Sequence, residues 1–348
     1  MNKRTTTLTI NYRAFCLGLL MISALLMVST QQLYSQTNTP TSIKPLAPAV
    51  LPGIGLAHFD FFYAGEAKKE LMFMVRDGKI AWSYTHPVTK GEISDAMILS
   101  NNNILFAHQF GITEITPDQK VVWNYDAPEG CEIHTAQAIG KDHVIFFQNG
   151  NPAKVIVMNK LTNKIVKELV IPVKNPASIH GQVRHARLTK AGTYLIALMD
   201  FGKVVEYDAM GKELMSIEAP GVWSAEELKN GNILITTSKV IREINRKQET
   251  VWEYTLADIP DYSIKSPQMS VRLKNGNTII NNWFNQWNGD GKVDLSNQPV
   301  QAIEVTKDKK IVWALRTWSG TENLGPSTII ITLKEAHVTE KVSFGDIH

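Results

Sequence analysis

A short β-prone phrase that ends in tryptophan or a substitute recurs along this chain of 348 residues. Four clear copies and two weaker ones occupy Lys79–Tyr84, Lys120–Tyr125, Thr250–Tyr254, Lys310–Leu315, Lys164–Leu169 and Lys212–Ile217. Neighbouring copies lie roughly 40 to 60 residues apart, a period that is typical of propeller blades. The repeat therefore predicts a radial array of similar sheets rather than one irregular core.

Each unit divides into four β-prone segments, most clearly between Val183 and Ile217. Similar turn sequences precede the second segment at Ser100–Asn103, Lys190–Thr193, Lys229–Asn232 and Lys274–Asn277. Asn-Gly and related pairs supply the positive φ that tight hairpin turns require. The pattern predicts an all-β protein, a six-bladed β-propeller of four-stranded antiparallel blades.

The two ends of the repeat region each hold an incomplete unit. The N-terminal unit supplies three strand-like segments, and the C-terminal part adds one unpaired apolar segment, Ser327–Leu333. We expect this C-terminal strand to complete the N-terminal blade, because ring closure removes exposed sheet edges. The repeat tryptophans should then pack between blades, at Trp82, Trp123, Trp252 and Trp313.

The N-terminus has the features of a targeting segment. Three basic residues precede the apolar run Ala14–Val28, so residues 1–35 are predicted to be a secretory signal peptide. An uncleaved anchor is the alternative, since the run is only slightly shorter than a membrane span. Residues 36–52 predict a flexible linker and 53–348 the propeller. We expect export to the periplasm or the extracellular space, with no membrane span in the mature chain.

Charge and cysteine content limit the classes of partner. Cleavage of the first 35 residues would remove three basic residues and no acidic one, leaving 33 of each. This balance gives no basic footprint for nucleic acid. Only Cys131 would remain, so no intramolecular disulfide can form and stability must come from packing.

Alignment of the repeats on the residue before each hairpin turn brings polar positions of the first strands together. These positions should surround the mouth of the central funnel, where a propeller can hold a small ligand. The ligand-binding candidates, including three taken from neighbouring segments, are Asp95, His134, His180, Arg184, His185, Trp223, Gln268, Trp283 and Trp287.

The catalytic candidates within this set are His134, Arg184 and His185. A neutral histidine can act as a nucleophile or general base near pH 7, and an arginine can hold a carboxylate or sulfate. Asp95 could orient an imidazole. The alternative is a hydrogen-bonded structural plug, because buried polar groups around the axis need partners in any case.

A long connection, Asn281–Gln298, places Trp283 and Trp287 among several amide side chains. Aromatic faces beside amides suit sugar rings and their hydroxyl groups, although such residues can also anchor a loop. We expect no metal site, since Arg184 would repel a cation between His180 and His185. No cofactor is expected.

Three phrases, Ser94–Phe106, Ile133–Phe146 and Val222–Ile235, each precede the tryptophan phrase or its substitute. Together they resemble bacterial periplasmic β-propellers of the quinoprotein-like (PQQ-like) and arylsulfotransferase-like repeat group, from Gly53 onward. Arylsulfotransferases of this group use a central histidine in a phrase similar to His-His-Asp-Ala. The chain has this phrase in fragments, so the resemblance implies His134 or His185 as sulfate-accepting candidates. The adjacent cysteines of quinone-dependent dehydrogenases are absent, so no quinone is implied.

These features lead to one principal hypothesis and two alternatives. The principal one is an exported propeller that binds a polar or anionic small ligand, derived from carbohydrate, in the funnel. The first alternative is an enzyme of arylsulfotransferase-like or polysaccharide-lyase type, with a funnel histidine as nucleophile or base and Arg184 as the anion clamp. The second is a scaffold that binds a protein partner on the rim.

Overall fold

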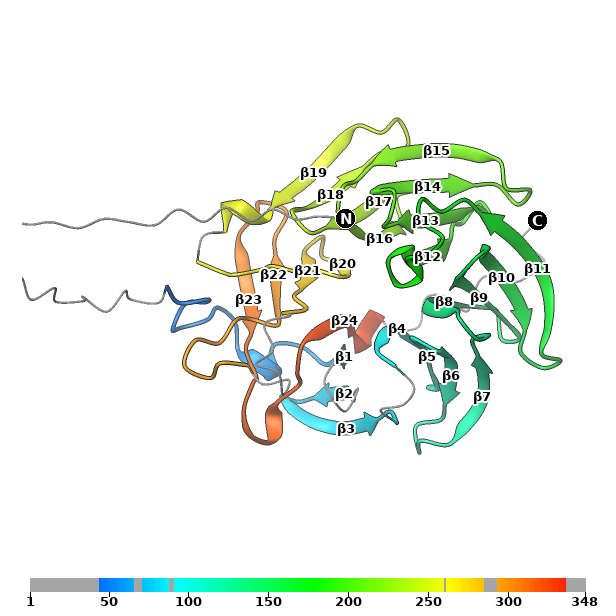
Figure 1. Cartoon of the computed structure of the whole chain (residues 1–348). Helices are drawn as coiled ribbons and strands as arrows, with labels where there is room; N and C mark the ends of the chain where they lie inside the picture. The colour runs from blue at the N-terminus through cyan, green and yellow to red at the C-terminus, as the bar shows by residue number, and fades with distance from the viewer. Residues whose placement is uncertain (1–43, 66–70, 88–90, 260, 285–292, 336–348) are drawn as a thin grey trace, which may run out of the picture. The chain divides into compact units, whose positions relative to one another are not determined.

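The computed structural model describes residues 44–65, 71–87, 91–259, 261–284 and 293–335. Six four-stranded antiparallel sheets surround a central axis (Figure 1). The remaining regular elements are short 3-10 turns, η1 (Gly55–Ala57), η3 (Ile179–Gly181), η4 (Leu256–Asp258), η5 (Gly320–Glu322) and η6 (Leu333–Glu335). The predicted all-β, six-bladed propeller is confirmed.

The strands of each blade follow the chain from the axis outward, apart from the closing strand of blade one. Blade one contains β24 (Ser327–Thr332), β1 (Phe61–Gly65), β2 (Leu71–Arg76) and β3 (Lys79–Thr85). Blade two contains β4 (Ile93–Ile98), β5 (Ile104–His108), β6 (Gly111–Ile115) and β7 (Val121–Asp126). Blade three contains β8 (Glu132–Ile139), β9 (His143–Asn149), β10 (Ala153–Asn159) and β11 (Lys164–Ile171).

The second half of the ring repeats this arrangement. Blade four contains β12 (Val183–Leu188), β13 (Tyr194–Leu198), β14 (Lys203–Tyr207) and β15 (Glu213–Glu218). Blade five contains β16 (Val222–Glu227), β17 (Ile233–Thr237), β18 (Val240–Ile244) and β19 (Thr250–Thr255). Blade six contains β20 (Ser270–Arg272), β21 (Thr278–Asn281), β22 (Ala302–Val305) and β23 (Ile311–Leu315).

The C-terminal strand closes the ring as predicted. β24 pairs antiparallel with β1, in a register that sets Phe61 opposite Thr332 and Ala64 opposite Ile329. The Thr328 hydroxyl also donates to the Ala64 carbonyl oxygen at 2.9 Å. Two chain segments far apart in sequence therefore form one blade, and each covers an edge of the other.

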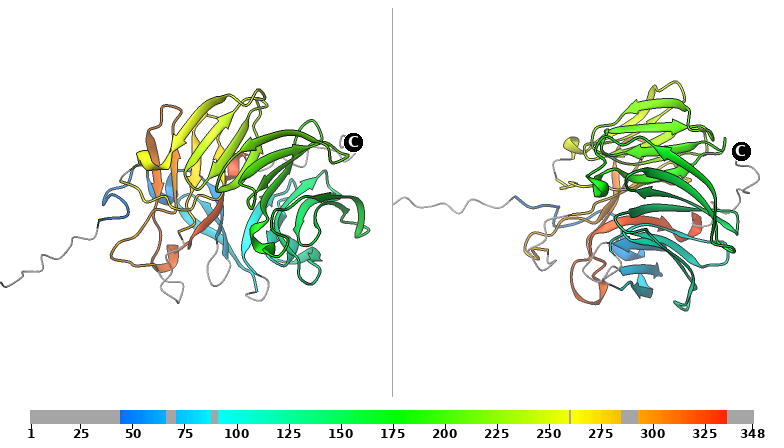
Figure 2. Two further views of the ribbon diagram at one scale, coloured as in Figure 1. Left: turned by 45° about the horizontal axis from the view of Figure 1, so that its top comes forward. Right: turned by 45° about the vertical axis from the view of Figure 1, so that its right-hand side comes forward.

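Apolar side chains are buried between neighbouring blades rather than in one shared core. One cluster, for example, joins strands of blade three to strands of blade four and includes Phe147, Tyr194 and Ile196. The outer strand β3 alternates between exposed and partly buried positions, whereas the second strand β5 is buried throughout. This difference follows from position, since the outer strands lie at the outside of the ring (Figure 2) and one face of such a strand is solvated.

The repeat tryptophans join neighbouring blades, as the sequence predicts. Each lies on the outer strand of its blade, and its indole nitrogen donates a hydrogen bond to the next blade or, for Trp313, to the segment that leads into blade one. The donors and acceptors are Trp82 with Pro117 O (2.8 Å), Trp123 with Asn163 Oδ1 (2.8 Å), Trp252 with Lys307 O (3.0 Å) and Trp313 with Gly55 O (2.8 Å).

A second repeated link uses a glutamate at the penultimate position of the third strand. In four blades this buried carboxylate accepts from the hairpin turn of its own blade and contacts a basic or imidazole side chain of the next. The four sets are Glu114 with Asn103 and Lys160, Glu206 with Thr193 and Arg246, Glu243 with Asn232 and Arg272, and Glu304 with Asn277 and His58.

The segment before blade one departs from the predicted flexible linker over residues 44–52. The Leu46 amide donates to Asn297 Oδ1 at 2.7 Å, and Arg316 donates to the carbonyl oxygens of Pro48 and Ala49. Ala47 is buried in a cluster with residues of blades five and six. This part of the chain is fixed to the propeller by backbone hydrogen bonds that composition alone does not predict.

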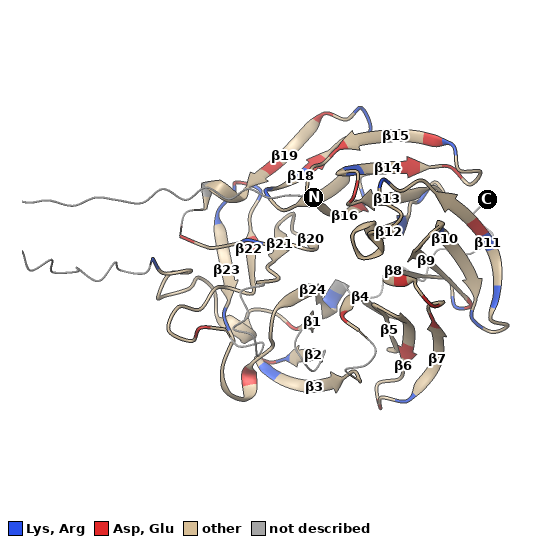
Figure 3. Ribbon diagram, in the orientation of Figure 1, with Lys and Arg blue, Asp and Glu red and all other residues tan. Residues whose placement is uncertain are grey.

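Residues 1–35, predicted as the signal peptide, lie outside the described residues. In the part of the chain that the structure describes, there is no helix with the length and apolar character to cross a membrane. Acidic and basic residues are distributed along the ribbon of the propeller (Figure 3), in keeping with the nearly balanced charge.

Candidate functional site

Polar side chains gather at one end of the axis, where the inner strands begin. β4, β8, β12 and β16 each enter the ring there, so residues near the start of one strand face those of the others. His180 joins them from η3, in the connection that leads into β12. We call this group the mouth cluster, which consists of Glu92, Ser94, Glu132, His134, His180, Arg184 and Trp223.

Arg184 is the centre of the mouth cluster. Its guanidinium group donates to the carboxylate of Glu92, to Nδ1 of His134 at 2.9 Å and to Nε2 of His180. The same group stacks over the Trp223 ring at 4.8 Å from the ring centroid. The Arg184 side chain is only 9% exposed, and three acceptors and one aromatic face thus hold it in place.

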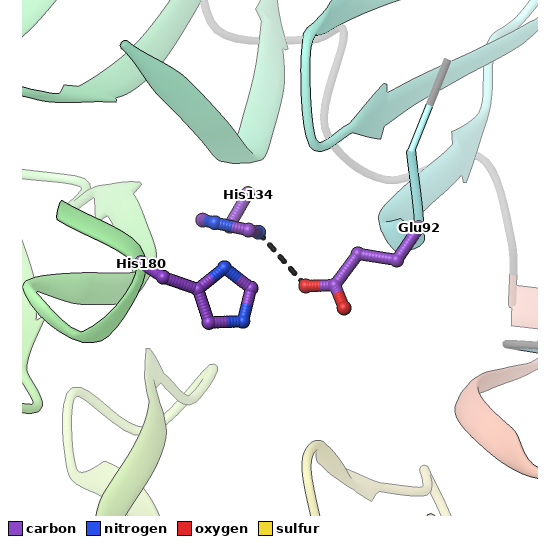
Figure 4. A group of neighbouring side chains, drawn as sticks. All are labelled: Glu92, His134 and His180. Atoms are coloured by element: carbon purple, nitrogen blue, oxygen red, sulfur yellow. Dashed lines mark ion pairs between the residues drawn. The ribbon is translucent and has the colours of Figure 1, made fainter. Parts of the chain in front are cut away.

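The contacts of Arg184 determine the tautomers of both histidines. Arginine can only donate, so the ring nitrogens of His134 and His180 that face it must accept. The other ring nitrogen of each donates to Oε2 of Glu132, at 2.9 Å from His134 and 2.7 Å from His180. This network fits two neutral imidazoles. Figure 4 shows their rings and the Glu92 carboxylate converging, with Glu92 Oε1 3.2 Å from His134 Nδ1.

Both carboxylates of the mouth cluster are stabilised in the ionised form. Burial opposes ionisation of Glu92, but the neighbouring His134 ring and the charge and hydrogen bond of Arg184 outweigh it and lower its pKa to about 2. Burial also opposes ionisation of Glu132, and hydrogen bonds from His134, His180 and Gln109 again lower the pKa well below its ordinary value. With neutral imidazoles, two carboxylates and one guanidinium give a net charge of −1.

A second polar group lies further along the axis, and we call it the axial ion pair. Arg187 contacts both oxygens of Asp95, at 2.7 and 2.8 Å, and the Thr135 hydroxyl and Ala136 amide also donate to this carboxylate. The expectation that Asp95 could orient an imidazole is therefore wrong. Arg187 binds this carboxylate instead, because its two parallel N–H donors match the two carboxylate oxygens.

His185 is buried and differs from the other two histidines. Its Nδ1 lies 3.0 Å from the Ala225 carbonyl oxygen and donates to it. Burial, together with the nearby charge of Arg187, lowers its pKa to about 3. An imidazole of such low basicity is a poor general base near neutral pH. His185 therefore suits a positioning role better than the catalytic role considered from the sequence.

A small cavity of about 10 Å³ separates His185 from the mouth cluster. Its walls bring together four predicted ligand-binding residues with two neighbours, Arg184, His185, Trp223, Gln268, Ser94 and Met269. This volume has room for about one water molecule. The cavity alone is too small for an organic ligand, so a ligand at this end of the axis would have to contact the mouth cluster itself.

The mouth cluster also contains a set of potential metal ligands. One donor atom each from Glu92, His134 and His180 lies within 4.8 Å of the others. Arg184, however, contacts all three residues and lies where a cation would need to be. A metal ion could enter only if the guanidinium moved away, because the two charges repel each other.

The aromatic connection predicted to help in binding is only partly described. Trp283 is half-buried, and its backbone amide donates to Ser266. Among the described residues it forms no hydrogen bond, ion pair or ring contact with the mouth cluster. Trp287 lies outside the described residues.

Sequence reasoning missed Glu92, Glu132 and Arg187. Glu92 and Glu132 occupy the same position in their repeats, two residues before Ser94 and His134. Side chains two apart on a strand lie on the same face, so extending the alignment by two positions would have found both carboxylates. Arg187 gave a mixed signal, since the aligned position holds Ile98 and Ala138 in two blades but Glu227 and Arg272 in two others.

Comparisons with known proteins support the fold and leave the activity open. No family model and no curated protein matches the chain. A protein of unknown function from Bacteroides caccae is 22% identical, with a TM-score of 0.67 over 78% of this chain and 98% of that one. A streptogramin B lyase is 14% identical, with a TM-score of 0.52 over 81% and 86%.

A catalytically inactive variant of virginiamycin B lyase from Staphylococcus aureus, crystallised with quinupristin, is also 14% identical. It has a TM-score of 0.50 over 76% of this chain and 88% of that one. Identities this low support the fold alone, since propellers host unrelated functions. The resemblance to quinoprotein-like and arylsulfotransferase-like propellers stays a prediction. In its fold, this chain is similar to these two lyases.

Proposed function

We propose that the protein binds a neutral, hydroxyl-rich ligand of carbohydrate type at the mouth cluster. The observation that carries this proposal is the fixed pairing of an aromatic face with several hydrogen-bonding groups at an accessible site. Trp223 is half-buried, the His180 side chain is 52% exposed, and Glu132 is 16% exposed. Sugars are recognised by such combinations, since their ring faces are apolar and their hydroxyls both donate and accept.

The charge of the mouth cluster favours a neutral ligand over an acidic one. Arg184 is already balanced by Glu92, and the cluster has a net charge of −1 with neutral imidazoles. An acidic ligand would therefore have to replace Glu92 at Arg184 and approach Glu132. A sugar hydroxyl needs no such exchange and can donate to either carboxylate. The proposal is thus narrower than the sequence prediction, which included anionic ligands.

Isothermal titration of the protein with matched oligosaccharides tests this proposal. One series would be neutral, and the second would carry uronic acids in the same linkages. We expect saturable binding of at least one neutral oligosaccharide. Trp223→Ala or Glu132→Gln should weaken this binding at least about tenfold, which corresponds to 1.4 kcal/mol of binding free energy. His143→Ala, a change at the start of β9 and outside the mouth cluster, is the control and should leave binding unchanged.

The proposal fails if no neutral oligosaccharide binds, or if binding survives both Trp223→Ala and Glu132→Gln unchanged. Tighter binding of the uronic-acid series would overturn the charge argument and favour the second candidate function below. Thermal unfolding of each variant separates loss of the site from loss of the fold.

A lyase-type enzyme is the second candidate, and the pairing of His180 with Glu132 favours it. Glu132 accepts from Nδ1 of His180 at 2.7 Å and so directs Nε2 towards Arg184. If a substrate carboxylate drew Arg184 away, Nε2 of His180 could remove the proton from the carbon beside that carboxylate; the C–O bond at the next carbon would then break, and the leaving oxygen would take a proton from solvent, which leaves a C=C bond. Formation of unsaturated products from uronic-acid oligosaccharides, and its loss in His180→Ala, would support this function.

We also propose that the protein is exported and that residues 1–35 are removed. The basic residues followed by an apolar run support this proposal. N-terminal sequencing of the protein purified from its native host should give a first residue near position 36. A first residue at or next to Met1, with the protein recovered from membranes, would indicate an uncleaved anchor instead.

A further inference from the structure

A groove of about 1140 Å³ opens at the end of the axis opposite the mouth cluster. It is lined by the incoming segment 58–60, by the ends of β2 and β24, and by turns of blades two and six. We call it the closure groove, because these elements meet where the two ends of the propeller join. Its volume slightly exceeds the roughly 300 to 1,000 Å³ typical of sites that hold organic ligands, so such a ligand would fit.

Ring closure accounts for the position of this groove. In blades two and six, a hairpin turn joins the inner strand to the second strand, and the turn residues Asn102 and Asn275 line the groove. Blade one has no such hairpin, since its inner strand β24 and its second strand β1 come from opposite ends of the propeller. The missing turn leaves a gap between its two neighbours.

The floor of the closure groove is apolar. Phe59, Met74, Ile98, Leu273 and Leu333 all contribute to its lining. Phe59 also packs against Trp313, with ring centroids 4.9 Å apart, so this part of the floor is held by the inter-blade core. An elongated apolar group could therefore bury its surface there without rearranging the blades.

The lining of the closure groove has more basic than acidic residues, three against two. Arg76 and Lys334 are exposed and form no hydrogen bond or ion pair within the described residues, and Lys274 adds a third basic group to the lining. Two acidic residues, Asp60 and Glu304, also line the groove, and each has a hydrogen-bond partner. Glu304 contacts His58 at 2.9 Å and accepts from Asn277, and Asp60 accepts from a backbone amide at 2.9 Å.

We propose that the closure groove binds an amphipathic anion, namely a long-chain carboxylate. The apolar floor would hold the chain, and Arg76 and Lys334 would hold the acid group. Charge complementarity supports this choice over a neutral lipid, because an uncharged head group would leave both cations without a partner. This site is separate from the mouth cluster and does not depend on the sugar-binding proposal.

Displacement of a fluorescent probe tests this inference with the full chain. The probe is 8-anilinonaphthalene-1-sulfonate, which combines an aromatic body with one anionic group, and the competitors are laurate and its uncharged analogue dodecanol. We expect saturable probe binding that laurate displaces. The double charge reversal Arg76→Glu/Lys334→Glu should weaken laurate binding by at least about tenfold. Lys164→Glu/Lys247→Glu makes the same charge change elsewhere and should leave binding unchanged.

Several results would overturn the inference. These are the absence of saturable displacement by laurate, equal affinity for dodecanol, or equal loss of binding in the two double variants. Thermal unfolding should show that both double variants fold as the unmodified protein does. Trp223→Ala should leave laurate binding intact, and a parallel loss there would place the ligand at the mouth cluster rather than in the closure groove.

Discussion

Removal of the Arg187 side chain tests whether the axial ion pair stabilises the propeller. Asp95 is 1% exposed, and Arg187 supplies two of the hydrogen bonds to its carboxylate, at 2.7 and 2.8 Å. Two hydrogen bonds to a charged group contribute roughly 3 to 6 kcal/mol, and breaking a buried pair costs about 3 to 5 kcal/mol. We therefore expect Arg187→Met to lower the free energy of unfolding by about 3 to 5 kcal/mol.

Equilibrium unfolding in urea, followed by tryptophan fluorescence, measures this loss. Arg76→Met is the matched control, since Arg76 is exposed, and should change stability by less than about 0.5 kcal/mol. The double variant Asp95→Leu/Arg187→Met removes both charges and should be more stable than Arg187→Met alone, because no buried carboxylate is left unpaired.

Two results would refute this reasoning. One is an unfolding free energy for Arg187→Met within about 1 kcal/mol of the unmodified protein, well below the 3 to 5 kcal/mol typical of a broken buried pair. The other is a double variant that is less stable than Arg187→Met. In either case Asp95 would not depend on this arginine for its charge.

Three further predictions concern pH, blade contacts and ring closure. The pKa of Glu92 is lowered from about 4.5 to about 2 in the folded state. Its contribution to the free energy of unfolding is therefore complete above pH 4.5 and is lost as pH falls towards 2. Glu92→Gln should therefore lower the melting temperature at pH 7, and the melting temperature of this variant should fall less steeply towards acidic pH. Parallel curves of melting temperature against pH for the variant and the unmodified protein would contradict this. Trp123→Phe removes the hydrogen bond to Asn163 and should cost about 1 to 2 kcal/mol in urea unfolding, whereas unchanged stability would argue against blade linkage. Truncation before Ser327 should abolish cooperative unfolding, and a synthetic peptide of residues 327–335 should restore it; a truncated chain with an unchanged melting temperature would refute closure by β24.

The sequence was sufficient to predict the architecture because a propeller repeats its local pattern. Strand alternation, the turn at Lys274–Asn277 and the tryptophan phrase each recur with every blade, so weak signals reinforce one another. The unpaired segment Ser327–Leu333 also indicated ring closure, since an apolar strand needs a partner. The link from Trp123 to the next blade followed from the same periodicity.

The candidate site was predictable only in outline. The repeat alignment placed His134, Arg184 and Trp223 near the axis, and the structure brings them together with His180. The alignment could not show which charged side chains would pair. That choice depends on side-chain distances across three blades, and the pairing of Asp95 with Arg187 joins residues 92 positions apart.

The closure groove and the charge of the mouth cluster were decided by tertiary structure alone. The groove exists because a hairpin is missing where two distant segments meet, and no local pattern marks a missing turn. The charge of −1 results from Glu92 and Glu132 remaining ionised beside neutral imidazoles, which depends on their partners. Periodicity in the sequence determined the ring of blades, whereas contacts between blades determined which polar groups are balanced and which can meet a ligand.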